Sequence, residues 1–309
     1  MSLPSFEADH VFGRLDGAVA LVTGAGTGLG LLAARALASN GATVFITGRR
    51  EDKLAEAVEV HGQGLRGKFV PLQLDVTDAD SLKKVAAGVQ SKEGKLHILI
   101  NNAGMIGPLT FLLGGGGGGD DDPSSQLSYS EKHLSNESFS QWDDTLRLNT
   151  SSVFFSTMTF LPLLEAGLKA PFRAGFSPTV INLSSVNSLI KKNNAAVTCY
   201  AYSAAKAAVN HLTRTLAHDL NYGHKVVGPP GIRVNAICPG VFASDMTGKP
   251  SQRGGVTPAE DVDVQPVNGR LGTPEEFASA ILFMANNTFL QGQVVVLCGG
   301  WTSIDPCTV

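Results

Sequence analysis

Short β-branched segments alternate along this chain with longer segments of helical periodicity, and this alternation constrains the fold more than any other feature. The seven segments that we expect to be strands are mostly apolar on both faces and cover residues 18–23, 42–47, 68–74, 96–100, 179–183, 232–237 and 293–297. The expected helices lie between them, at residues 29–39, 53–59, 78–90, 142–164, 199–221 and 274–285. Strands without a polar face are typical of a parallel sheet that helices cover on both sides. The pattern therefore predicts an α/β fold with a doubly wound parallel sheet of about seven strands.

The pattern continues without a linker, so we expect a single domain over residues 17–302. Residues 1–16 would form an N-terminal extension, and residues 303–309 a C-terminal tail.

One insertion rich in Gly, Asp and Ser interrupts the alternation at about residues 107–138, and it contains the glycine run 114–119. Such a composition cannot bury enough apolar surface to fold by itself. We interpret the insertion as a flexible surface loop. A lid over the ligand crevice is the alternative, because loops after the carboxyl ends of parallel strands line that crevice.

Composition excludes several classes of partner. A formal net charge of -3 and the lack of a long basic cluster argue against a nucleic-acid partner. The four cysteines are widely spaced and predict neither a metal site nor a disulfide framework, which is the usage expected of a reduced, cytoplasmic protein. Residues 1–12 lack an apolar signal-peptide core, and we expect no membrane-spanning segment elsewhere.

A glycine-rich turn lies between the first expected strand and the first expected helix. It has the sequence Thr23-Gly24-Ala25-Gly26-Thr27-Gly28-Leu29-Gly30. Glycines permit a tight turn and a close approach of the backbone to a diphosphate, and the free N–H groups of the helix start attract its charge. Strand, glycine turn and helix together predict a Rossmann-type dinucleotide site, with Gly24, Thr27, Gly28, Leu29 and Gly30 in contact with the cofactor. A purely structural turn is the alternative.

Two arginines follow the second expected strand, where an NAD-binding protein usually carries an acidic residue. The guanidinium groups of Arg49 and Arg50 suit a ribose 2′-phosphate, so NADP is the expected cofactor and NAD is less favoured. Alternatively, both arginines are solvated at a helix start, where Glu51 and Asp52 neutralise them.

Polar residues also follow the third and fourth expected strands. Asp75 and Val76 are expected at the adenine, with the Asp75 carboxylate accepting from the adenine amino group. Asn102, Ala103 and Gly104 close the fourth strand and are expected to contact the cofactor. Each group on its own is equally explained by turn chemistry.

Tyr202 and Lys206 are four residues apart in a helical segment, so they share one face and can act on one ligand. A phenol with a pKa near 10 is a poor acid-base catalyst at neutral pH, and a nearby ammonium group can lower that pKa. Alone, such a pair is common on helix surfaces.

These motifs, in this order, closely resemble the short-chain dehydrogenase/reductase family over nearly the whole chain. The matching segments are Thr23-Gly24-x-x-x-Gly28-x-Gly30, Asn101-Asn102-Ala103-Gly104 and Tyr202-x-x-x-Lys206. The resemblance implies that Ser185 and Tyr202 bind the reacting oxygen while Lys206 binds the nicotinamide ribose and lowers the pKa of Tyr202. It also implies that Asn149 holds a water in a proton relay. Ser184 is the less favoured serine because neighbouring side chains of a strand alternate between its faces.

The resemblance further places Pro239, Gly240, Val241 and Ser244 at the nicotinamide carboxamide and a variable substrate loop at residues 245–269. The implied activity is NADP(H)-dependent hydride transfer between nicotinamide and a carbonyl or secondary alcohol of a small molecule, in a homodimer or homotetramer. Fungal members, some of which act in secondary metabolism, are the most similar. A non-redox enzyme of this fold, such as an isomerase or cyclase, and a cofactor-binding scaffold are the alternatives.

Two departures from the family pattern stand out. The insertion after Gly104 is long, and the segment between Ser185 and Tyr202 is a few residues longer than usual.

Overall fold

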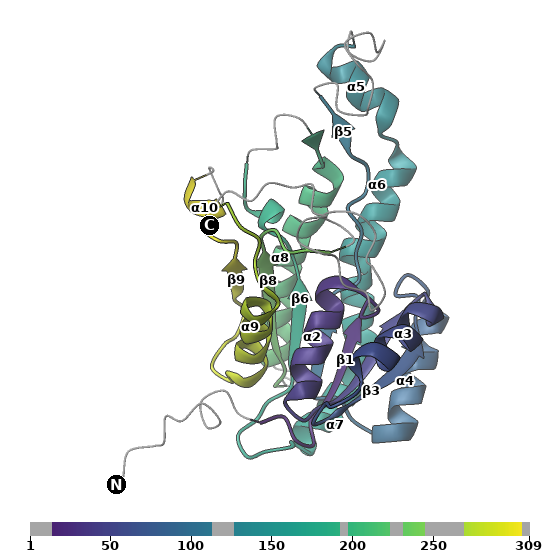
Figure 1. Cartoon of the computed structure of the whole chain (residues 1–309), viewed down its shortest axis with the longest axis vertical. Coiled ribbons are helices and arrows are strands. Elements are labelled where there is room, and N and C mark those ends of the chain that lie inside the picture. The colour runs from purple at the N-terminus through teal and green to yellow at the C-terminus, as the bar shows by residue number, and fades with distance from the viewer. Residues whose placement is uncertain (1–13, 113–126, 192–196, 223–230, 245–268, 305–309) are drawn as a thin grey trace.

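The computed structural model describes residues 14–112, 127–191, 197–222, 231–244 and 269–304 (Figure 1). Its main sheet has seven parallel strands in the order β3-β2-β1-β4-β6-β8-β9. These strands are β1 (Val19–Thr23), β2 (Thr43–Gly48), β3 (Lys68–Gln73), β4 (Ile98–Asn101), β6 (Thr179–Leu183), β8 (Arg233–Pro239) and β9 (Val294–Leu297). The predicted α/β fold with a doubly wound, Rossmann-type parallel sheet is confirmed.

Helices cover both faces of this sheet (Figure 1). They are α2 (Gly28–Ser39), α3 (Glu51–His61), α4 (Ala79–Glu93), α7 (Ser152–Lys169), α8 (Tyr200–Asn221) and α9 (Pro274–Asn286). Helix α6 (Phe139–Leu146) precedes α7, and the short α10 (Trp301–Ile304) follows β9. Successive side chains of β1 point to opposite faces of the sheet. Ala20 belongs to the core between the sheet and helices α2 and α9. Leu21 belongs to the core between the sheet and helices α4, α7 and α8. Since both layers are apolar, β1 is buried along its whole length.

The strand order reverses at the centre of the sheet and thereby positions the site. Crossovers after β1 lead to β2 and β3 on one side, whereas β4, β6, β8 and β9 follow on the other. Between β1 and β4 the connections diverge, and the carboxyl ends of those strands bound a crevice where doubly wound sheets bind ligands.

The described flanks of the insertion differ from the expected surface loop. Residues Thr110–Phe111 form β5, which pairs antiparallel with β7 (Val197–Thr198). A short helix, α5 (Tyr129–Asn136), begins at a capping box made by Ser128 and Glu131. Figure 1 shows α5 and α6 projecting beyond the end of the main sheet. The glycine run 114–119 and most of the substrate loop lie outside the described residues.

One described helical run, Phe139–Lys169, is long and apolar enough to cross a membrane by length and composition, with a mean hydropathy of 1.2. However, the α7 part of this run packs against β4 and β6 and buries Val153, Phe160 and Leu164. We therefore interpret it as a core helix.

His97, just before β4, provides a test of how the core responds to acid. Its Nδ1 accepts from the Val19 N–H group at 3.0 Å and its Nε2 lies 3.0 Å from the carbonyl oxygen of Ala170, so Nε2 carries the proton. Burial lowers the pKa of His97, and the pairing with Ala170 only partly opposes this. Because the unfolded chain takes up a proton near pH 6.5 and the folded chain does not, stability should fall as the pH drops below about 6.5.

We expect His97→Asn to flatten this dependence between pH 7 and 5, because asparagine can still accept from Val19 but cannot be protonated. Urea unfolding at each pH measures it, with His218→Asn at an exposed position as control. Equal slopes for the wild type and His97→Asn would contradict the assignment.

Candidate active site

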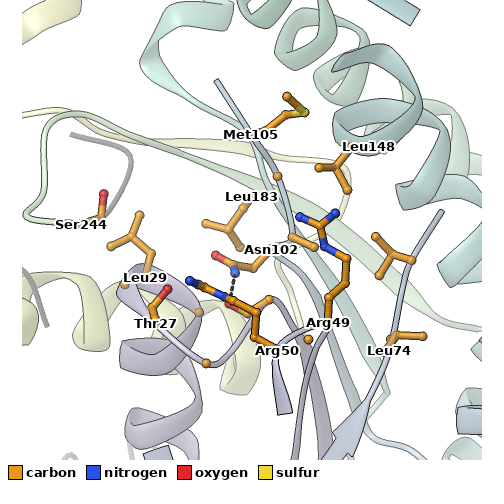
Figure 2. Close-up of a pocket in the computed structure, with 18 of the residues that line it drawn as sticks. Thr27, Leu29, Arg49, Arg50, Leu74, Asn102, Met105, Leu148, Leu183 and Ser244 are labelled. Carbon is orange, nitrogen blue, oxygen red and sulfur yellow. Dashed lines mark hydrogen bonds between the residues drawn. The ribbon is translucent and has the colours of Figure 1, made fainter. Parts of the chain in front are cut away.

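A cavity of about 420 Å³ lies at the carboxyl edge of the sheet (Figure 2). The glycine turn forms its floor, the end of β2 forms one wall, and α8 closes the far end. Of the predicted cofactor contacts, the lining includes Gly24, Thr27, Gly28, Leu29, Gly30, Arg49, Arg50, Asp75, Val76, Asn102, Ala103, Gly104, Tyr202, Lys206 and Ser244.

The glycine turn is shaped to bring backbone close to a ligand. Gly24 and Gly28 have φ angles of +64° and +54°, which L side chains rarely adopt. A methyl group at Gly30 would overlap the carbonyl oxygen of Gly24 and the amide nitrogen of Asn102. Helix α2 starts at this turn, and its N-cap Thr27 makes no side-chain capping bond. The first N–H groups of α2 therefore have the arrangement of an anion site.

Asn102 connects the glycine turn to the end of β4. Its Nδ2 donates to the carbonyl oxygens of Thr23 and Gly24 at 2.8 and 3.0 Å. The N–H groups of Asn102 and Ala103 in turn donate to Thr23 Oγ1 at 2.9 and 3.0 Å. The segment after β4 thus holds the turn in shape as well as lining the cavity.

Cationic side chains gather where β2 ends. Arg49 and Arg50 are both exposed, and Figure 2 shows them extending from the end of β2 into the pocket. Lys53, in the first turn of α3, also lines the cavity and pairs with Glu56 at 2.7 Å. This end of the cavity is therefore positively charged.

Asp75 has both of the roles considered for it, because it stabilises a turn and also lines the cavity. Its Oδ1 accepts from the Thr77 N–H group at 2.9 Å and from Thr77 Oγ1 at 2.7 Å. Burial raises the pKa of Asp75, but the Thr77 bonds and the charges of Arg49 and Arg147 outweigh it and lower the pKa overall. The residue is an ionised turn cap that also faces the cavity.

Tyr202, Lys206 and Ser184 line the far end of the cavity, whereas Ser185 does not. Tyr202 and Lys206 lie on the buried face of α8, at 7% and 4% exposure. Ser185 lies close enough to the Tyr202 phenol to lower its pKa. Lys206 Nζ donates to the carbonyl oxygen of Leu183 at 2.7 Å and lies 5.7 Å from the centroid of the Tyr202 ring. Ser184 instead donates to the carbonyl oxygen of Lys206 at 3.0 Å, so it faces the backbone of α8.

The pKa of Tyr202 is raised, whereas the sequence led us to expect that it would be lowered. Burial raises it to about 12, and only the nearby Ser185 side chain opposes that rise. Burial likewise lowers the pKa of Lys206 to about 8. The reason is desolvation, which disfavours the charged form of each group more than the distant ammonium favours a phenolate.

Asn149 lies in a π-helical turn, η2 (Arg147–Ser151), that separates α6 from α7. Its Oδ1 accepts from the Met105 N–H group at 2.9 Å and its Nδ2 donates to the Met105 carbonyl oxygen at 2.7 Å. A Cβ at Gly104 would lie 2.7 Å from Asn149 Oδ1 and 3.6 Å from Lys206 Nζ. Asn149 and Lys206 therefore flank Gly104, although Asn149 does not line the cavity. Isolated π turns within helices are frequent at functional sites.

No cluster of His, Cys, Asp or Glu that could hold a metal ion is present in the described part of the chain.

Comparison with known proteins identifies the architecture. The family model for short chain dehydrogenases matches residues 18–254, more than half of the chain. This chain belongs to that family. A fungal relative, the short-chain dehydrogenase/reductase PhomF of Diaporthe leptostromiformis, is 34% identical over 98% of this chain and 97% of its own length. The short-chain dehydrogenase/reductase VdtF of Byssochlamys spectabilis is 32% identical over 94% and 95%.

Solved structures of similar proteins agree with this placement. A Pseudomonas aeruginosa RhlG/NADP active-site complex has a TM-score of 0.70 and 28% identity, covering 94% of this chain and 99% of its own. The NADPH-dependent 3-quinuclidinone reductase of Rhodotorula rubra has a TM-score of 0.68 and 25% identity, covering 97% of each chain. The chain is thus an oxidoreductase of the short-chain dehydrogenase/reductase family.

Three predicted cofactor contacts of this short-chain dehydrogenase lie outside the main cavity. Pro239 ends β8, and Gly240 and Val241 line a separate cavity of about 120 Å³ beside α9 and α10. A Cβ at Gly240 would lie 2.8 Å from the Cα atom of Cys298, so this glycine serves a close crossing of two chain segments.

Several lining residues were not predicted. They are Gly26, Gly48, Lys53, Leu54, Leu74, Met105, Ile106, Leu148, Leu183 and Ser184. Most are apolar neighbours of the motif residues, and their only signal in the sequence is that they adjoin the ends of strands.

Proposed function

We propose that this short-chain dehydrogenase is an NADP(H)-dependent oxidoreductase that moves a hydride between nicotinamide and a carbonyl or secondary alcohol of a small organic substrate. One observation carries the proposal: a single cavity extends from the arginines at the end of β2, over the glycine turn, to Tyr202 and Lys206. Its lining runs from cationic to catalytic side chains as a dinucleotide site would need, and the absence of a side chain at Gly30 lets the glycine turn pack closely against Asn102.

The residues that would hold NADP(H) are distributed along this cavity. The start of α2, from Thr27 to Gly30, would hold the diphosphate, while Arg49 and Arg50 would hold the 2′-phosphate. Asp75 and Val76 would lie at the adenine, and Asn102, Ala103 and Gly104 along the middle. Ser244 would contact the carboxamide, with Pro239, Gly240 and Val241 behind it. When bound, the nicotinamide supplies or accepts the hydride.

The chain's own groups would control the substrate oxygen and its proton. Ser185 and the Tyr202 phenol donate hydrogen bonds to that oxygen, which stabilises the charge that develops on it. A phenol with a pKa of about 12 keeps its proton at neutral pH, so Tyr202 is suited to donate that proton when a carbonyl is reduced. Lys206 holds the ribose, and Asn149 fixes the backbone at Met105 beside Lys206 and forms part of the proton path.

No observation favours the alternatives. A scaffold without chemistry does not need both Tyr202 and Lys206 at the end of a cofactor-sized cavity. We further propose a cytoplasmic homodimer or homotetramer that uses α7 and α8, because Phe154 and Phe155 of α7 are exposed at 40% and 57%. A role in fungal secondary metabolism also remains a proposal.

Cofactor preference tests the role of the arginines. We expect NADPH to bind at least tenfold more tightly than NADH, a difference of about 1.4 kcal/mol, and Arg49→Ala/Arg50→Ala to remove the preference. Fluorescence titration with each cofactor measures both dissociation constants. Arg35→Ala, on the exposed side of α2, is the control and should retain the preference. Equal affinity of the wild type for both cofactors would reject the assignment of Arg49 and Arg50.

A further inference from the structure

The two departures from the family pattern fold against each other. The insertion after Gly104 supplies β5 and α5, and the extra length between Ser185 and Tyr202 supplies β7. In the pair β5–β7, Thr110 is opposite Thr198 and Phe111 is opposite Val197. We call residues 105–112, 127–139 and 197–200 the cap.

A buried carboxylate ties the cap together. Glu137, whose side chain is 10% exposed, accepts from Thr110 Oγ1 at 2.8 Å, from His133 Nδ1 at 2.7 Å and from Trp142 Nε1 at 2.8 Å. These donors come from β5, α5 and α6. Burial raises the pKa of Glu137, but the three donors outweigh it and lower the pKa overall. The carboxylate is therefore ionised and holds three elements at one point.

The cap also connects directly to the catalytic groups. Strand β7 leads through Cys199 into α8, and Tyr202 lies in the first turn of that helix. Asn187 bridges to the serine: its Nδ2 donates to Cys199 Sγ at 3.2 Å, and its N–H group donates to Ser185 Oγ at 3.2 Å. A shift of β7 would consequently also move Ser185 and Tyr202, the residues proposed to bind the substrate oxygen.

A second connection joins α5 to α8. The hydroxyl groups of Tyr129 and Tyr200 are 2.7 Å apart, and the His133 ring packs against both phenol rings at centroid distances of 4.7 and 5.4 Å. The start of the catalytic helix is thus held by the cap from two sides.

The surface of the cap is unusually apolar. Of the fifteen large hydrophobic side chains that are exposed among the described residues, seven belong to it: Met105, Phe111, Leu127, Tyr129, Leu134, Phe139 and Tyr200. Met105 and the neighbouring Ile106 also line the cofactor cavity, so the cap adjoins the active site at these two residues. Exposed apolar surface that adjoins a polar catalytic pocket is typical of a ligand-binding wall.

We propose that the cap is the substrate-binding wall of this enzyme, that it selects carbonyl compounds with an apolar body, and that Glu137 is the positioning residue that fixes the cap relative to Ser185 and Tyr202. The proposal rests on the proposed carbonyl reduction and adds the class of substrate to it. Glu137 touches neither substrate nor cofactor; it acts through β5 and β7.

The test compares two ketones that share one reacting ring, cyclohexanone and 4-phenylcyclohexanone, with NADPH as reductant. We expect the wild type to prefer the phenyl compound at least about tenfold in kcat/KM, because apolar contacts of this size contribute about 1–3 kcal/mol. Glu137→Gln keeps the shape of the side chain but places an amide donor among three donors. It should lose about tenfold on the phenyl compound and less than about threefold on cyclohexanone, with an unchanged dissociation constant for NADPH.

Thr110→Val removes a single donor and should shift the same ratio less, which keeps the test valid should Glu137→Gln fail to fold. Ser91→Ala, at an exposed position of α4 outside the cap, is the matched control and should leave the preference between the two ketones unchanged. Equal losses on the two ketones in Glu137→Gln, or a wild type without preference for the phenyl ring, would overturn the proposal.

Failure of the proposed function can be told apart from failure of the cap proposal. Should the wild type turn over neither ketone, carbonyl reduction is in question, and the cap is then tested by calorimetric binding of 4-phenylcyclohexanone to the enzyme saturated with NADP⁺. Binding that Glu137→Gln weakens about tenfold would support the cap proposal, and absent or unchanged binding would reject it.

Discussion

Tyr202→Phe is expected to lower kcat by at least about a thousandfold, which corresponds to about 4 kcal/mol of transition-state stabilisation. The phenol is buried, near Ser185 and one helical turn from Lys206, and phenylalanine keeps its ring while removing the proton that the reaction needs. Since Phe fits the same space, the affinity for NADPH should stay within about threefold of the wild type.

Steady-state kinetics and NADPH titration of the same preparation separate the two effects. Tyr222→Phe, an exposed phenol at the end of α8, is the control and should retain full activity. Near-native turnover of Tyr202→Phe would show that another group handles the proton.

Gly30→Ala is expected to abolish tight cofactor binding, with a loss of at least about a hundredfold, or about 2.7 kcal/mol, in NADPH affinity. The added methyl group would collide with the Gly24 carbonyl oxygen and with Asn102 Nδ2, both of which belong to the network that shapes the glycine turn. The backbone of the glycine turn cannot move away from the added methyl group without displacing the first N–H groups of α2.

Gly88→Ala provides the contrast for Gly30→Ala. Gly88 lies inside α4, and a methyl group there would make only an ordinary contact, 3.9 Å from Leu72 Cδ1. Alanine is the better helix former by up to about 1 kcal/mol, so Gly88→Ala should bind NADPH normally and unfold at the same or a higher temperature. Unaltered NADPH affinity in Gly30→Ala would reject the glycine turn as the diphosphate site.

The sheet could be predicted because most of its strands are apolar on both faces. β1 is buried at every position, and β8 likewise, so neither shows a polar face that would suggest an antiparallel edge. The expected helix 142–164 is observed as α6 and α7 joined by the π turn η2, which is defined by its backbone hydrogen bonds and is not marked by the residue types at those positions.

The cap could not be predicted from periodicity. Strands β5 and β7 have two residues each, and the paired residues Thr110 and Thr198 are 88 positions apart in the sequence, so no local pattern marks these strands. Glu137 reads as an ordinary surface acid, and only the tertiary fold brings its three donors to it. Similarly, the spacing of Tyr202 and Lys206 places both on one helix face, but the direction of their pKa shifts depends on burial, which spacing does not reveal.

Deuterium transfer from NADPH that carries deuterium at both C4 positions of the nicotinamide tests the proposed hydride transfer. The enzyme is incubated with the labelled cofactor and an apolar ketone, the absorbance at 340 nm is followed, and the product is examined by mass spectrometry. The account predicts one deuterium on the carbinol carbon for each NADPH oxidised, and no such transfer with Tyr202→Phe. Conversion of the ketone with constant absorbance and no deuterium in the product would contradict it and indicate non-redox chemistry on this fold.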